Sequence, residues 1–173
     1  MNKNKNYIML NGKKIPLTDE QVKLIQSDVP EKSPFDRAHH GGTYFSVISN
    51  FELNENCECS SHLDDKIFNS SNYCTDKNIM RQHALHMKLN NLLWRYSMTH
   101  GGDSIDSDNN NETKVNIYIY YNAVTDEFRC SAYSFLKYFG SVLFASEETA
   151  EAAIEEIVKP FIAEHPDFDV TKM

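Results

Sequence analysis

The thiols and imidazoles around Cys57-Glu58-Cys59 are the side chains in the first half of the chain that are best suited to chemistry. Cys57, Cys59 and His62 supply donor types that bind soft metals. His83 and His86, three residues apart, could add further imidazole donors. However, we expect the two sulfurs of the cysteine pair to point to opposite faces of a strand. The sequence also has no second cysteine pair at zinc-ligand spacing. We therefore predict no metal site and no cofactor. A hydrolase or metalloprotein that uses Cys57, Cys59 and His62 is the alternative that stays open.

Cys74 is a second candidate, because a thiol just before a helix N-terminus can have a lowered pKa and act as a nucleophile. It occupies the place that Phe144 takes in the second half of the chain, which favours an apolar core position. The sequence contains no Gly-rich phosphate loop, Ser-His-Asp pattern or HExxH motif. These observations predict that the protein is not an enzyme.

Acidic side chains are concentrated in the second half of the chain. Residues 103–173 carry 14 Asp/Glu against five Lys/Arg, while the whole chain has a net charge of −8. A basic stripe is missing, so we expect no direct binding of nucleic acid. A basic partner protein is the alternative that this charge favours. The residues predicted to bind such a partner are Asp103, Asp106, Asp108, Glu112, Glu147, Glu148, Glu151 and Glu155, with the aromatic side chains of Tyr118 and Tyr120.

A purely structural explanation of the same carboxylates stays open. Glu147, Glu148 and Glu151 lie in the first turns of a predicted helix, where negative charge interacts favourably with the helix dipole. The remaining acidic groups would then serve only to keep the protein soluble.

Composition and length indicate a folded chain without a membrane span. The 173 residues are 40% hydrophobic, which is enough for a core. No run of about 18 apolar residues occurs, and the N-terminus lacks the apolar segment of a signal peptide. The four cysteines are few for this length and are expected to be reduced thiols. We therefore expect a cytoplasmic protein.

Two similar halves are predicted to position these side chains. The first has strands near 43–48, 51–59 and 72–74 and a helix over 76–98. The second has strands near 115–121, 127–133 and 142–144 and a helix that begins after Ser146. Asp76 and Ser146 fall at the same place in the two halves, and both are favoured N-cap residues. We predict an α+β fold of two antiparallel units, each about βββα.

The other segments complete the predicted domain plan. Asn11-Gly12 between apolar runs predicts a hairpin, and Thr18-Asp19-Glu20-Gln21 predicts a capping box at the start of a short helix. Residues 1–33 form this N-terminal piece, 34–100 the first repeat, 101–113 an acidic flexible linker and 114–173 the second, acidic repeat. Residues 60–71 are expected to be a loop. Trp94 is expected to meet the other repeat, and Pro160 to kink or end the last helix.

Several segments resemble an uncharacterised family of small proteins that is frequent in prophages of low-GC Gram-positive bacteria. The segments that carry the resemblance are Leu10-Asn11-Gly12-Lys13, Thr18-Asp19-Glu20-Gln21-Val22, Pro34-Phe35-Asp36-Arg37, Asn72-Tyr73-Cys74-Thr75-Asp76-Lys77, Leu92-Leu93-Trp94-Arg95, Tyr138-Phe139-Gly140 and Phe144-Ala145-Ser146-Glu147-Glu148-Thr149-Ala150.

This resemblance implies a phage accessory protein in the host cytoplasm that binds and inhibits a host protein without enzymatic activity. An anti-CRISPR protein or another anti-defence inhibitor would fit that description. The alternative is a protein that binds or sequesters a nucleotide signal with the aromatic side chains of Tyr118, Tyr120, Tyr133 and Tyr138.

Overall fold

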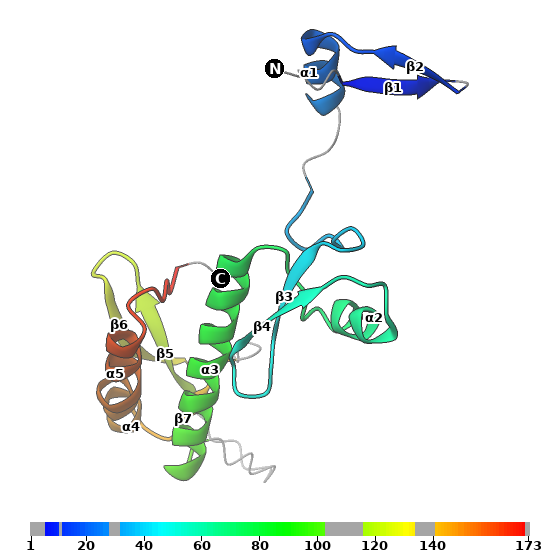
Figure 1. Cartoon of the computed structure of the whole chain (residues 1–173). Coiled ribbons are helices and arrows are strands. Elements are labelled where there is room, and N and C mark those ends of the chain that lie inside the picture. The colour runs from blue at the N-terminus through cyan, green and yellow to red at the C-terminus, as the bar shows by residue number, and fades with distance from the viewer. Residues whose placement is uncertain (1–5, 11, 28–31, 103–115, 134–140, 172–173) are drawn as a thin grey trace. The chain divides into compact units, whose positions relative to one another are not determined.

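The computed structural model describes residues 6–10, 12–27, 32–102, 116–133 and 141–171 (Figure 1). The chain divides into two compact units, Met1–Asp36 and Arg37–Met173. The first unit contains the hairpin β1 (Tyr7–Leu10) and β2 (Lys13–Pro16) and the helix α1 (Asp19–Ser27).

The N-terminal unit follows its sequence signals. Gly12 has a φ of 76°, a left-handed conformation that the tight turn between β1 and β2 requires and that glycine adopts without strain. At the start of α1, the Gln21 backbone N–H donates to the Thr18 hydroxyl at 3.2 Å, and the Thr18 N–H donates to the Gln21 side-chain carbonyl at 3.0 Å. The predicted hairpin and capping box are both confirmed.

The second unit holds the remaining strands and helices, in chain order. They are β3 (Thr43–Val47), β4 (Leu53–Cys57), α2 (His62–Asn69), α3 (Lys77–Thr99), β5 (Asn116–Asn122), β6 (Glu127–Tyr133), β7 (Leu143–Phe144), α4 (Glu147–Ala153), the π-helical turn η1 (Ile154–Val158) and α5 (Lys159–Glu164).

The predicted α+β repeat is present in the pairing of these strands. The β3–β4 hairpin is extended by an antiparallel bridge between Phe45 and Cys74, and the β5–β6 hairpin by β7, where Phe144 lies opposite Ile117. Cys74 and Phe144 therefore hold equivalent positions, and both are buried.

The predicted strand over 72–74 is reduced to the single bridge at Cys74, whereas β7 is a strand of two residues. In both halves an N-capped helix follows, as predicted. The Asp76 carboxylate accepts hydrogen bonds from Asn78 N at 2.8 Å and Ile79 N at 3.1 Å. The Ser146 hydroxyl accepts one from Thr149 N at 3.2 Å.

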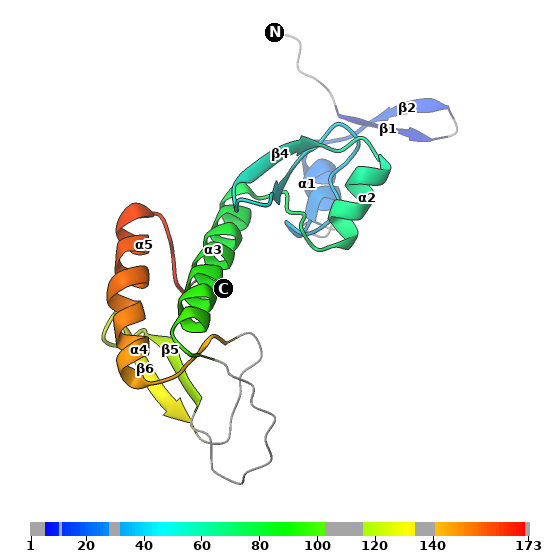
Figure 2. The same ribbon diagram turned by 90° about the horizontal axis from the view of Figure 1, so that it is seen from below.

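Helix α3 is shared by the two halves. Near its N-terminus Met80 packs with Phe45 and Cys74 of the first half. One to three turns later, Leu85 and Leu89 pack with apolar side chains of η1 and α5. Figures 1 and 2 show α3 between the β3–β4 hairpin and the second sheet with its helices. The leucines on this face of α3 thus join the two repeats.

Residues 62–69 form α2, so the prediction of a loop over 60–71 is wrong. The Ser61 hydroxyl accepts from Asp64 N, and the Asp64 carboxylate accepts from Ser61 N, which is a capping box with Asp in place of the usual Glu or Gln. Ile67 and Phe68 are half-buried on this short helix. The polar composition of the segment hid a helix that these caps stabilise.

Two further expectations concerned Trp94 and Pro160 on these helices. Trp94, which was expected to meet the second repeat, is 53% exposed. Pro160 does not end the last helix, which continues to Glu164. Because Pro160 has no N–H to donate, the preceding turn widens into η1, where Lys159 N bonds to Ile154 O. None of the described helices is long and apolar enough to cross a bilayer.

Candidate functional site

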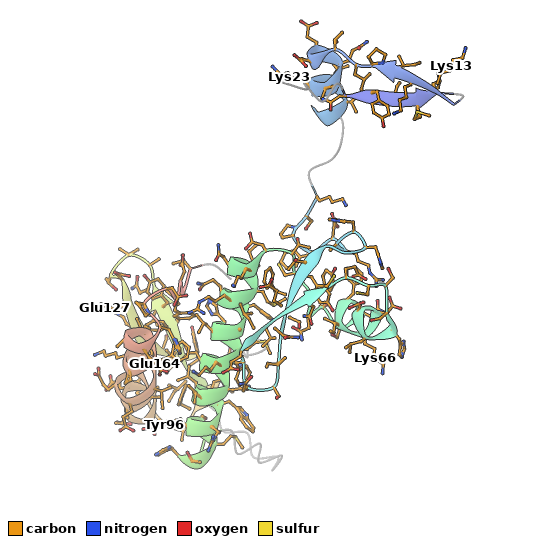
Figure 3. All side chains as sticks on the ribbon, viewed as in Figure 1. Lys13, Lys23, Lys66, Tyr96, Glu127 and Glu164 are labelled. Atoms are coloured by element: carbon orange, nitrogen blue, oxygen red, sulfur yellow. The ribbon has the colours of Figure 1, made fainter. Side chains whose placement is uncertain are left out.

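An acidic groove runs between β6 and the helical stretch α4–η1 and has a volume of about 850 Å³. Its lining has five carboxylates and two cationic side chains. These charged residues are Asp126, Glu127, Glu148, Glu151, Glu155, Arg129 and Lys159. Figure 3 shows Glu127 at the hairpin end of β6 and Glu164 on α5, on the same side of α3, whereas Lys66 belongs to α2 on the other side.

The register of the second sheet forms one wall of this acidic groove. β6 is an outer strand of the described sheet, whose order is β6-β5-β7. Cys130 lies opposite Ile119, which packs against the buried alanines of α4. Because side chains alternate along a strand, Phe128 and Cys130 face the helix. The apolar floor of the groove comes from these two side chains.

The amphipathic pattern of the last helix forms the other wall. Ala150, Ala153 and Ile154 are buried against the sheet. Glu148, Glu151 and Glu155 follow at steps of three and four, so they form one stripe along the neighbouring, exposed face. The sequence pattern that buries the alanines therefore also aligns these carboxylates along the groove.

Both cationic side chains of the groove form ion pairs with nearby carboxylates. Arg129 contacts the Glu127 carboxylate at 2.9 Å, and Lys159 pairs with Glu155 one turn away. Among the described residues, neither Glu148 nor Glu151 is joined to a cation. The negative charge of the lining is therefore only partly compensated.

The pKa values of two groups that line the groove are shifted, each for its own physical reason. Burial raises the pKa of the Cys130 thiol, and the negative charges of Glu151 and Glu147 raise it further. The pKa of Glu148 is lowered by a hydrogen bond from its own backbone N–H and by one from the Ser146 hydroxyl. At neutral pH the helix N-terminus thus holds Glu148 in its charged form.

The acidic lining continues beyond this groove. A second hollow of about 570 Å³ shares Asp126, Phe128 and Ile162 with it and reaches the C-terminal residues 166–171. Asp167 and Asp169 add two carboxylates there. Asp167 also holds the C-terminal segment to α3 through Arg81, whose Nη2 lies 3.1 Å from Oδ1.

The predicted site residues separate into three groups. Glu148, Glu151 and Glu155 line the groove, and Glu147 lies close enough to Cys130 to affect its thiol. Tyr118 and Tyr120 have ring centroids 6.2 Å apart and lie on the sheet face that points away from α4, because they alternate with Ile117 and Ile119. The positions outside the described residues are Asp103, Asp106, Asp108, Glu112, the side chain of Tyr133, and Tyr138.

Asp126, Glu127, Arg129 and Lys159 were missed by sequence reasoning. Asp126 ends the β5–β6 turn and has a left-handed φ of 56°. The alternating pattern of β6 predicts which of its residues face the helix, but not that the strand lies at the sheet edge beside α4.

A second polar cluster lies beside the β3–β4 hairpin and has a structural role. Glu58 is only 1% exposed, and its carboxylate accepts hydrogen bonds from Arg37 Nε and Nη2, both at 3.0 Å. It also accepts from the Tyr73 hydroxyl at 3.0 Å and Ser60 N at 2.7 Å. Hydrogen bonding to Arg37 is the main cause of the lowered pKa of Glu58. Because four donors already engage this carboxylate, it has little capacity left for a ligand.

Asp64 is the second buried carboxylate of this cluster. It accepts hydrogen bonds from the Tyr44 hydroxyl at 2.7 Å, Ser61 N at 2.9 Å and Cys59 N at 3.1 Å. These bonds, led by that of Tyr44, lower the pKa of Asp64. Asp64 thus fixes the loop between β4 and α2 rather than presenting a reactive group.

Cys57 and Cys59 do not point to opposite faces, so that prediction is wrong. Residues two apart along an extended chain share a face, and here both thiols are exposed while Glu58 between them is buried. The thiols interact, and a hydrogen bond with Cys57 raises the pKa of Cys59. In the part of the chain that the structure describes, no three His, Cys, Asp or Glu side chains gather as a metal site.

The other candidates for chemistry occupy structural positions. Cys74 is buried, and burial raises the pKa of its thiol, as expected for a core cysteine. His86 contacts the Asp169 carbonyl at 3.2 Å and the Phe168 ring, and burial lowers its pKa. His86 therefore helps to hold the C-terminal segment against α3.

Comparison of the chain with protein-family models, curated proteins and solved structures gives no match.

Proposed function

We propose that this protein is a non-enzymatic binding protein that receives a positively charged surface of a partner protein in its acidic groove. The groove itself carries this proposal, since five carboxylates line it against two cations that are already engaged in local ion pairs. Complementary charge increases the association rate and selects among partners.

The partner would be a host protein with a basic, nucleic-acid-binding surface. Carboxylates spaced along a helix can occupy such a surface in place of phosphates and so prevent nucleic acid from binding. Under this proposal the chain acts as a phage accessory inhibitor, such as an anti-CRISPR or other anti-defence protein. The phage context comes from the family resemblance, and the basic partner from the charge of the groove.

The alternative, a protein that sequesters a nucleotide signal, is less well supported. The Tyr118–Tyr120 pair lies on the sheet face away from α4, and the acidic groove would repel phosphate. A nucleotide that bound the native state would raise the melting temperature. We expect no such rise in a thermal-shift screen.

Capture followed by charge neutralisation tests the main proposal. The immobilised chain is exposed to lysate of a low-GC Gram-positive bacterium, and the captured protein is identified, purified and titrated by calorimetry. We expect the double variant Glu148→Gln/Glu151→Gln to bind this partner roughly 10-fold more weakly, since about 1.4 kcal/mol of charge interaction is lost. Raising the salt concentration should weaken wild-type binding more than binding of the variant.

The matched control is Glu52→Gln/Glu55→Gln, which removes the same charge from exposed positions on the β3–β4 hairpin. It should bind like the wild type. Equal weakening by both double variants would attribute the effect to net charge and contradict a role for the groove. Failure to capture any stoichiometric partner would argue against the proposal as a whole.

A further inference from the structure

The backbone around Cys57 and Cys59 is held in place on both sides. Glu58 N donates to Gly42 O at 2.8 Å, and Gly41 N donates to Glu58 O at 2.7 Å. Cys59 N donates to the Asp64 carboxylate at 3.1 Å. These bonds extend the pairing of the hairpin past Cys57, where β4 ends, so the two thiols project from a fixed segment.

Both thiols are accessible and adjacent. Each is exposed, and they lie on the same side of the chain because Glu58 between them points inward. The buried carboxylate of Asp64 accepts a hydrogen bond from Cys59 N at 3.1 Å and so places negative charge close to Cys59. A bound cation would be favoured by this charge.

We propose that Cys57 and Cys59 form a two-thiolate site for a soft monovalent cation of the Cu(I) class. Thiolates select soft ions, and structural Zn²⁺ needs four protein ligands, whereas no third donor gathers here among the described residues. Each thiol releases its proton when the metal–sulfur bond forms, so binding of one cation replaces up to two protons. The oxidation state of sulfur and metal does not change.

Competition with a coloured Cu(I) chelator, bicinchoninate, tests this site under anaerobic conditions with a non-thiol reductant. The full chain should take one Cu(I) from the chelator. Cys57→Ser and Cys59→Ser should each weaken binding on the order of 100-fold, because the second sulfur no longer binds intramolecularly. Both residues are exposed, so the circular dichroism spectrum of each variant should match that of the wild type.

Cys130→Ser is the matched control, because it also removes one thiol and should keep wild-type Cu(I) affinity. Retention of full affinity by either Cys57→Ser or Cys59→Ser would overturn the proposal, as would an equal loss in Cys130→Ser. Displacement of Cu(I) by equimolar Zn(II) would overturn the two-ligand assignment. None of these outcomes depends on the acidic groove, so they test the thiol site separately from the proposed partner binding.

Discussion

Replacing Arg37 with Ala tests most directly the polar cluster around Glu58 beside the β3–β4 hairpin. Arg37 places two hydrogen bonds on the Glu58 carboxylate, and its Nη1 lies 2.7 Å from Asp65 Oδ1. Its removal leaves the Glu58 carboxylate, which is 1% exposed in the intact protein, with only Ser60 N and the Tyr73 hydroxyl as donors.

This geometry determines how much stability Arg37→Ala should lose. Removing one partner of a buried ion pair costs about 3–5 kcal/mol. The lower end applies because Arg37 is 34% exposed and Glu58 keeps two donors. A loss of about 3 kcal/mol corresponds to a melting temperature roughly 6–12 °C lower for a domain of this size.

The pH dependence has a definite sign. The pKa of Glu58 is lowered in the folded protein, so its contribution to stability is fully present above its unfolded pKa of about 4.3. That contribution is lost as pH falls through the folded pKa. The free energy difference between wild type and Arg37→Ala should therefore narrow between neutral and acidic pH.

Urea denaturation followed by circular dichroism, at neutral pH and at several acidic pH values, measures both effects. Arg129→Ala is the control, because Arg129 pairs with Glu127 at 2.9 Å on the exposed surface. This substitution should lower the free energy of unfolding by less than about 1 kcal/mol. If Arg37→Ala costs no more than Arg129→Ala, or if its cost is the same at every pH, the reasoning about a buried carboxylate is refuted.

Three further predictions concern glycine and cysteine. Gly102→Ala should destabilise the protein by about 2 kcal/mol or more in urea denaturation, because a Cβ there would lie 2.8 Å from a backbone carbonyl of β7. The control Gly101→Ala is strained only by its φ of 76° and should cost about 1 kcal/mol. Equal losses of stability in the two variants would contradict this prediction. Glu151→Gln should speed alkylation of Cys130 at neutral pH, because it removes one of the charges that raise the pKa of this thiol. Peptide mass spectrometry follows the alkylation rate. An unchanged rate would mean that the Glu151 carboxylate does not lie near the thiol. Cys74 should resist the same reagent until the protein unfolds, and labelling in native buffer would contradict its burial.

Local signals in the sequence were sufficient for most of the fold. The equivalence of Asp76 with Ser146, and of Cys74 with Phe144, was readable because capping and alternation depend on residues close in the chain. Helix α2 was missed because its capping residues lie in a polar segment whose apolar side chains are few.

The candidate site was predictable only in part. Glu148, Glu151 and Glu155 could be assigned to one helix face from their spacing. That Tyr118 and Tyr120 lie on the other side of the sheet depends on which face of β5 the helix covers. Alternation alone defines two faces without saying which of them is buried.

By itself the sequence determined the two-repeat plan, the caps and the concentration of acid in the second half, because each depends on residue type and short spacing. Only the tertiary structure decided that β6 lies beside α4 to form the groove, that Arg37 neutralises Glu58 from 21 residues away, and that Cys57 and Cys59 are exposed on one side. These features arise from contacts between segments distant in the chain, where packing of the whole core selects the partners.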